Sequence, residues 1–168
     1  MGYIHRYHSQ YFTAAALERE DEFFMAKALA LADRAAAQGE TPVGCVIVTN
    51  GQIVGRGYNR RETGRSALAH AELEAIAQAC RTLGGWRLWQ CTLYVTLEPC
   101  PMCAGAIINA RIPRVVYGAA DAKAGSCGSV TDLFALPYNH HPKVTSDVLA
   151  EECAAQLRDF FQRLRTGK

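Results

Sequence analysis

The sequence contains no apolar run long enough to cross a membrane, and its first residues lack the apolar stretch of a signal peptide. It also has no internal repeat, no low-complexity tract and no linker rich in proline or glycine. Its 168 residues fit one domain of ordinary size. These absences predict a cytoplasmic protein without a membrane partner.

The chain also lacks an even number of cysteines. It has seven, so they cannot all form disulfide bonds within one molecule. They are Cys45, Cys80, Cys91, Cys100, Cys103, Cys127 and Cys153. Free thiols or metal ligands in a reducing compartment are therefore expected.

The chain also lacks a large excess of one charge, since it has 18 basic and 16 acidic residues and a net charge of +2. The charges are nevertheless unevenly placed. Residues 52–66 and 158–168 each carry a net charge of +3, which leaves −4 for the remainder. Basic clusters of this kind favour a phosphate-binding surface, although the C-terminal cluster fits a solvated helix end equally well.

The apolar periodicity predicts alternating helices and strands. Helices are expected over residues 21–38, 71–82, 103–110 and 148–164, and strands over 43–48, 52–57, 92–97 and 114–118. An Asn-Gly pair joins the first two strands as a hairpin, and the later strand–helix–strand order implies a parallel crossover. The expected fold is α/β, a three-layer α-β-α arrangement whose mixed central sheet carries helices on both faces. Residues 1–19 show no period and are expected to be an N-terminal extension of unknown role, leaving 20–168 as the domain.

Two short segments carry potential chemistry, His70-Ala71-Glu72 and Pro99-Cys100-Pro101-Met102-Cys103. One imidazole and two thiolates are a typical zinc set, and three protein ligands leave the fourth position for water. Both segments begin predicted helices, where free N–H groups and the positive end of the helix dipole stabilise thiolates. Glu72 would then be placed to act as a base toward a metal-activated water.

Each segment alone has other interpretations. A Cys-Pro-x-Cys after a strand also occurs in redox proteins, and a structural zinc site could recruit Cys80, Cys91 or Cys127. Neither alternative requires Glu72. The combination His-x-Glu with Pro-Cys-x-x-Cys is the signature of zinc-dependent nucleobase deaminases.

At these residues the sequence resembles the cytidine-deaminase-like superfamily, and within it most closely the bacterial tRNA-specific adenosine deaminases. The likeness extends over residues 21–164. It is carried by segments 41–44, 57–60, 69–72, 92–100, 102–107, 118–123, 139–140 and 159–161.

The resemblance implies a set of roles. One zinc ion per chain would be held by His70, Cys100 and Cys103, and Glu72 would pass a proton from the zinc-activated water to the base. The reaction would convert the wobble adenosine of a tRNA anticodon stem-loop to inosine, in a homodimer. Further substrate-binding residues would be Asn59, Ala71, Asp121, Lys123, Asn139 and His140.

Two features leave the substrate open at this stage. Ala120 stands where many relatives carry a basic residue, and Pro101 is also found in guanine deaminases. A deaminase of a free base or nucleoside, of the guanine or cytosine type, is the alternative enzyme. A non-catalytic zinc-dependent RNA-binding module is the alternative from another class, and the intact Glu72 argues against it.

Overall fold

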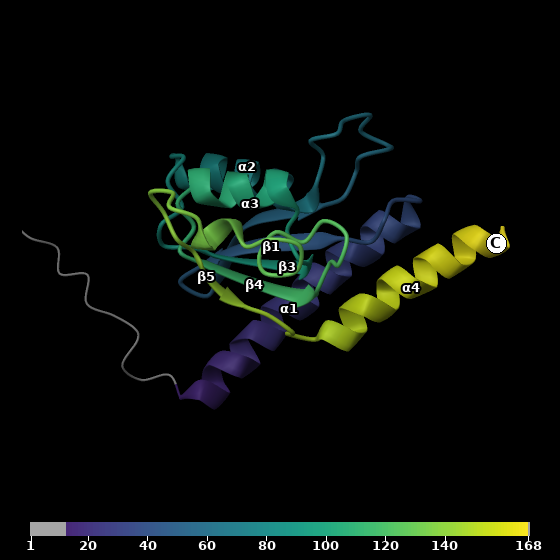
Figure 1. Cartoon of the computed structure of the whole chain (residues 1–168), viewed down its shortest axis with the longest axis horizontal. Coiled ribbons are helices and arrows are strands. Elements are labelled where there is room, and N and C mark those ends of the chain that lie inside the picture. The colour runs from purple at the N-terminus through teal and green to yellow at the C-terminus, as the bar shows by residue number, and fades with distance from the viewer. Residues whose placement is uncertain (1–12, 168) are drawn as a thin grey trace, which may run out of the picture.

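The computed structural model describes residues 13–167, in which five strands form one sheet between two pairs of helices (Figure 1). The helices are α1 (Ala14–Ala37), α2 (Ala71–Leu83), α3 (Pro101–Asn109) and α4 (Ala150–Thr166), with a short 3-10 turn η1 (Leu133–Ala135). The strands are β1 (Gly44–Thr49), β2 (Gln52–Tyr58), β3 (Thr92–Leu97), β4 (Arg114–Ala119) and β5 (Lys143–Thr145). The predicted α/β class is confirmed.

The strands pair in the order β2-β1-β3-β4-β5. The two pairings of β1, with β2 and with β3, are antiparallel, whereas the pairings of β4 with β3 and β5 are parallel. The sheet is therefore mixed. Both the predicted hairpin and the predicted parallel crossover through α3 are present.

Helices cover both faces of the sheet, with α2 and α3 on one face and α1 and α4 on the other (Figure 1). Alternate side chains of each strand enter opposite cores. Ile47 and Leu93 pack toward α2 and α3, whereas Val46 and Tyr94 pack toward α1 and α4. Burial on both faces explains why the central strands appear in the sequence as continuous apolar runs.

The main differences from the sequence prediction are in α1, α3 and β5. Helix α1 begins at Ala14 rather than residue 21, because the Thr13 side chain caps it by accepting a hydrogen bond from the Ala16 N–H. The expected extension therefore loses residues 14–19 to this helix, and residues 1–12 lie outside the described part of the chain. Helix α3 begins at Pro101, two residues early, and the three-residue edge strand β5 was not predicted.

A largely buried ion pair joins α1 to strands β3 and β4 of the sheet. Both oxygens of the Asp21 carboxylate accept hydrogen bonds from the Arg114 guanidinium, at 2.8 and 2.6 Å, and the Tyr94 hydroxyl donates to one of them. Asp21 thus faces the sheet from the interior of α1. Among residues 13–167 no helix has the length and apolar character that a membrane crossing requires.

Two glycines let the helices approach the sheet closely enough to fix their positions. A Cβ atom at Gly44 of β1 would lie 1.9 Å from the Ala28 carbonyl oxygen of α1. A Cβ atom at Gly57 of β2 would lie 2.1 Å from the Ala71 carbonyl oxygen, in the first turn of α2. The start of α2 is therefore seated directly on the backbone of β2.

Replacing Gly57 tests this seating. Gly57→Ala is expected to lower the free energy of unfolding by about 3 kcal/mol, because the added methyl group meets backbone atoms that cannot move aside individually. Urea unfolding measures the change. Gly85→Ala is the matched control, since Gly85 has open space and an ordinary backbone conformation. Equal stability of the two variants would contradict the close contact between β2 and α2.

Candidate metal centre and substrate cavity

The chemically reactive residues lie where two helices begin. His70 precedes the first residue of α2 as its N-cap, and Cys100 holds the same position before α3. Neither side chain caps its own helix, so both remain available as ligands. Pro101 occupies the first helical position, as its missing N–H predicts, and Cys103 follows in the first turn.

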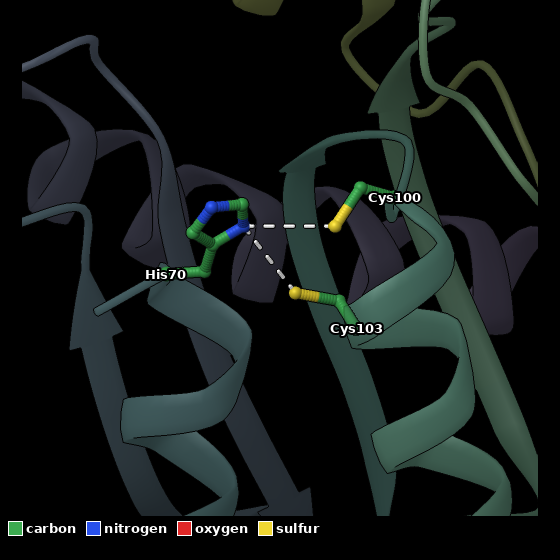
Figure 2. A group of neighbouring side chains, drawn as sticks. All are labelled: His70, Cys100 and Cys103. Carbon is green, nitrogen blue, oxygen red and sulfur yellow. Dashed lines mark hydrogen bonds between the residues drawn. The ribbon is translucent and has the colours of Figure 1, made fainter. Parts of the chain in front are cut away.

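The three side chains point toward one another across the gap between the helices (Figure 2). The Nδ1 atom of His70 lies 3.7 Å from the Cys100 sulfur and 3.5 Å from the Cys103 sulfur. A tetrahedral zinc ion with ordinary Zn–N and Zn–S bonds separates such atoms by about 3.6 Å. Both the chemistry of the donor set and its spacing therefore fit zinc.

This trio is the only group of three or more His, Cys, Asp or Glu side chains within residues 13–167 whose ligand atoms all come within 4.8 Å of one another. Cys80, Cys91 and Cys127 do not join it, so the described chain supplies no fourth cysteine for a closed structural site. The five cysteines outside the trio are free thiols, and all but Cys80 are buried.

The two sulfurs affect each other's ionisation. The neighbouring Cys103 thiol, together with His70, lowers the pKa of Cys100 to about 4. The contact with Cys100, together with burial, raises the pKa of Cys103. A divalent cation held by both sulfurs would stabilise the two thiolates, since thiolates are the form that binds metal.

Glu72 lies in the first turn of α2 with only 4% of its surface exposed. Burial is the main reason that the pKa of its carboxyl group rises to about 7. A carboxyl group with such a pKa accepts and returns a proton readily near neutral pH. It lies two residues from His70, and both line the same cavity.

That cavity has a volume of about 230 Å³ and opens beside His70 and Cys100, two of the candidate metal ligands. Six residues expected to hold zinc, move protons or bind substrate contribute to its wall. They are Asn59, His70, Ala71, Glu72, Cys100 and Asp121. The wall also contains residues to which the sequence interpretation gave no separate role. They are Thr41, Val43, Arg61, Leu97, Glu98 and Ala124.

Asn59 joins two segments of the wall. Its side-chain nitrogen donates to the Thr41 carbonyl at 3.2 Å, and its side-chain oxygen accepts from the Arg61 N–H at 3.1 Å. Each group keeps further hydrogen-bonding capacity, one N–H and one lone pair. The amide is thus held in one orientation while it still has a donor and an acceptor for a base.

Three further residues of the expected RNA-binding set lie outside the cavity. The Lys123 and Asn139 side chains are exposed, and Lys123 meets the cavity wall only through its backbone N–H, which donates to Asp121. The Nε2 atom of His140 donates to the Ile112 carbonyl at 2.7 Å, at the turn after α3. Contacts of these residues with RNA remain predictions.

Sequence reasoning missed Glu98, a buried carboxylate that organises the loop after β4. Its two oxygens accept hydrogen bonds from the backbone N–H groups of Asp121, Cys127 and Ser129 and from the Ser129 hydroxyl. The side chain is 2% exposed, and these donors lower its pKa despite its burial. The loop that carries Asp121 and Ala124 is therefore built around one carboxylate. Its sequence signal is an acidic residue between an apolar strand and Pro99.

Glu40 does the same for the loop after β2. It is 1% exposed, and its carboxylate accepts from the backbone N–H groups of Glu62 and Thr63 at 3.2 and 2.6 Å. This loop carries Asn59 and Arg61 into the cavity wall. Two buried carboxylates outside the metal set thus fix the two loops that border the cavity.

Comparisons with known proteins agree with this geometry. The family model for the cytidine and deoxycytidylate deaminase zinc-binding region matches residues 18–119. A tRNA-specific adenosine deaminase of Bacillus subtilis is 48% identical over 150 residues, which cover 89% of this chain and 93% of the relative.

Solved structures show the same likeness. A tRNA:A34 deaminase structure, from work on A-to-I editing at the wobble position of transfer RNA, superimposes with a TM-score of 0.77 at 44% identity. That match covers 80% of this chain and 99% of the other. A guanine deaminase from Bacillus subtilis gives a TM-score of 0.59 at 37% identity, covering 86% and 93%.

The matched zinc-binding region contains all three candidate ligands and Glu72. The chain therefore belongs to the cytidine and deoxycytidylate deaminase family and, within it, to the tRNA-specific adenosine deaminases.

Proposed function

We propose that this chain is a zinc-dependent hydrolase that converts the wobble adenosine of a tRNA anticodon to inosine. The observation that carries the proposal is that Glu72 lines the same cavity as His70 and Cys100, two members of the His70, Cys100 and Cys103 trio. A metal that polarises water and a carboxylate that moves its proton are the two parts that hydrolytic deamination requires.

His70, Cys100 and Cys103 would hold one zinc ion, which when bound makes water a nucleophile near neutral pH. Glu72 takes a proton from the attacking water and delivers it to the N1 ring nitrogen of adenine as oxygen bonds to C6. The same carboxylate then moves the proton of the new C6 hydroxyl to the amino group, so that this oxygen becomes the carbonyl of inosine. The C6–N bond then breaks and ammonia leaves. Water and adenosine are consumed, and inosine and ammonia are formed.

The rest of the wall orients the base and keeps bulk water away. Asn59 offers a donor and an acceptor held in a fixed orientation. Val43 and Leu97 add apolar surface against which a purine ring packs. Ala71 lies between the metal ligand and the proton carrier, where a small side chain leaves space for the base.

Charge placement favours RNA over a free base. The segment 52–66, with its net charge of +3, forms β2 and the loop that leads to the cavity. In Figure 1 this loop and the second half of α4, which carries the other basic cluster, project toward the same side of the molecule. A single-stranded anticodon loop would pair its phosphates with such a surface.

Separate incubations with RNA and with small molecules test which substrate the chain deaminates. The purified zinc-loaded chain is incubated with an anticodon stem-loop that has adenosine at the wobble position, and separately with free guanine and with cytidine. We expect inosine in the stem-loop and no ammonia from the small molecules. Ammonia from guanine or cytidine without inosine in RNA would assign the chain to free-base or nucleoside deamination.

Glu72→Gln tests the proton carrier, because glutamine keeps the shape of glutamate but does not exchange protons. We expect unchanged zinc content and unchanged stem-loop affinity, with inosine formation reduced at least about 1,000-fold, within the usual contribution of a positioned acid–base group. Elemental analysis, RNA binding and single-turnover assays measure the three quantities. Undiminished turnover would remove Glu72 from the mechanism.

We also propose a homodimer in the cytoplasm, where tRNA is used in translation. Large apolar side chains are exposed on segments that border the cavity, among them Leu68 and Val130. A second copy of the chain would cover such surface. Sedimentation equilibrium is expected to give twice the mass of the 18.4-kDa chain, and a monomer at micromolar concentration would contradict the dimer.

A further inference from the structure

Among residues 13–167, Arg61 is the only lysine or arginine in the wall of the cavity. Within residues 13–167 its guanidinium makes one long ion contact, 3.9 Å from Nε to the Glu62 carboxylate, and no hydrogen bond. Both side chains are exposed, Arg61 by 55%, so this contact holds the guanidinium weakly. The charge of Arg61 therefore remains available to a ligand.

The neighbouring Arg60 is in the opposite situation. Its Nε and Nη2 atoms donate to the Glu74 carboxylate of α2, with the shortest contact at 2.7 Å. Arg60 borders a different surface hollow, with Gly64 and Ala69. Two adjacent arginines thus have different environments, because Arg60 is paired with Glu74 of α2 whereas Arg61, in the cavity wall, has only its long contact with Glu62.

The backbone beneath Arg61 is fixed in place. Its N–H donates to the Asn59 side chain, and its carbonyl accepts from the Ser66 N–H at 3.1 Å. The next two N–H groups donate to the buried Glu40. A guanidinium on a rigid backbone loses less entropy when it binds a ligand than one on a mobile loop.

Besides two of the candidate metal ligands, the wall of the cavity contains the carboxyl groups of Glu72 and Asp121, which repel a phosphate when they are ionised. A base enters such an interior as a neutral ring, whereas its phosphate groups must stay outside. Arg61 lies at the boundary between the two. Its planar guanidinium matches the paired oxygens of a phosphate.

We propose that Arg61 binds a phosphodiester directly adjoining the target adenosine and thereby makes the site select a nucleotide within RNA over a free base. This inference rests on the proposed function and specifies which part of the RNA the cavity rim recognises. Asn59 and Glu40 act on Arg61 as positioning residues, since they hold the backbone from which it projects.

The experiment removes the negative charge of the RNA phosphate and the positive charge of Arg61, separately and together. Three matched stem-loops carry an uncharged methylphosphonate linkage on the 5′ side of the target adenosine, on its 3′ side, or in the distant stem. A fourth stem-loop carries phosphate throughout, and all four have deoxyribose at the sugars that precede these linkages. Each is assayed with the zinc-loaded wild-type chain, Arg61→Ala, Arg61→Lys and Arg81→Ala.

For the wild-type chain, one of the two adjoining neutral linkages is expected to raise KM about tenfold with kcat changed less than about twofold, as loss of one charged hydrogen-bonded contact predicts. Arg61→Ala is expected to have the same raised KM already with the all-phosphate RNA, and its KM should not rise further with the neutral linkage. Its slope of log affinity against log salt should be smaller by about 0.7, the value for one single-strand phosphate. Arg61→Lys should restore much of the sensitivity, because it returns the charge.

Arg81→Ala removes the same charge from the other end of α2 and is expected to behave as wild type with every RNA. The inference is overturned if the wild-type chain is indifferent to both adjoining linkages, or if Arg61→Ala loses as much from the neutral linkage as wild type does. Absence of inosine in an unmodified all-ribose stem-loop with wild type would overturn the proposed function itself, which is a distinguishable result. Zinc content and thermal unfolding of each variant confirm that the fold is intact.

Discussion

The structure depends on the convergence of two helix N-termini at one end of a mixed sheet. The β1–β2 hairpin leads into α2, and the β3–α3–β4 crossover is parallel, so α2 and α3 begin side by side on the same face. This topology brings His70 close enough to Cys100 and Cys103, which are thirty or more positions away in the sequence, for all three to bind one metal ion. Ligands of α/β sheets bind at such ends, where strands finish and helix N-termini face the same space.

Close contact between helix and strand backbones fixes the helix positions closely enough for their side chains to bind one metal ion. Gly57 lets the first turn of α2 rest on β2, and Gly44 does the same for α1 on the opposite face. The first turn of α2 then carries both a ligand and Glu72. Since Glu72 is buried by the same packing, its raised pKa is a consequence of where the helix is seated. Fold and proton chemistry share one cause.

The sequence allowed most of the fold and the candidate metal set to be predicted, because both depend on local pattern. Strands covered on both faces are continuous apolar runs, and ligands at helix starts have a recognisable spacing. The first turns of α1 could not be predicted because Leu17 there is exposed, which interrupts the apolar period. Strand β5 was not predicted because it is too short to show a period. The roles of Glu40 and Glu98 could not be predicted for another reason. Each finds its N–H donors more than twenty residues away, a relation that only the tertiary structure supplies.

The most direct test of the central claim is a zinc titration of the metal-free chain with two readouts, bound metal and inosine at the wobble position of the stem-loop. We predict that inosine formation rises in proportion to bound zinc and stops rising at one zinc per chain. Undiminished inosine formation in the metal-free chain, or saturation at a different stoichiometry, would contradict the site built from His70, Cys100 and Cys103.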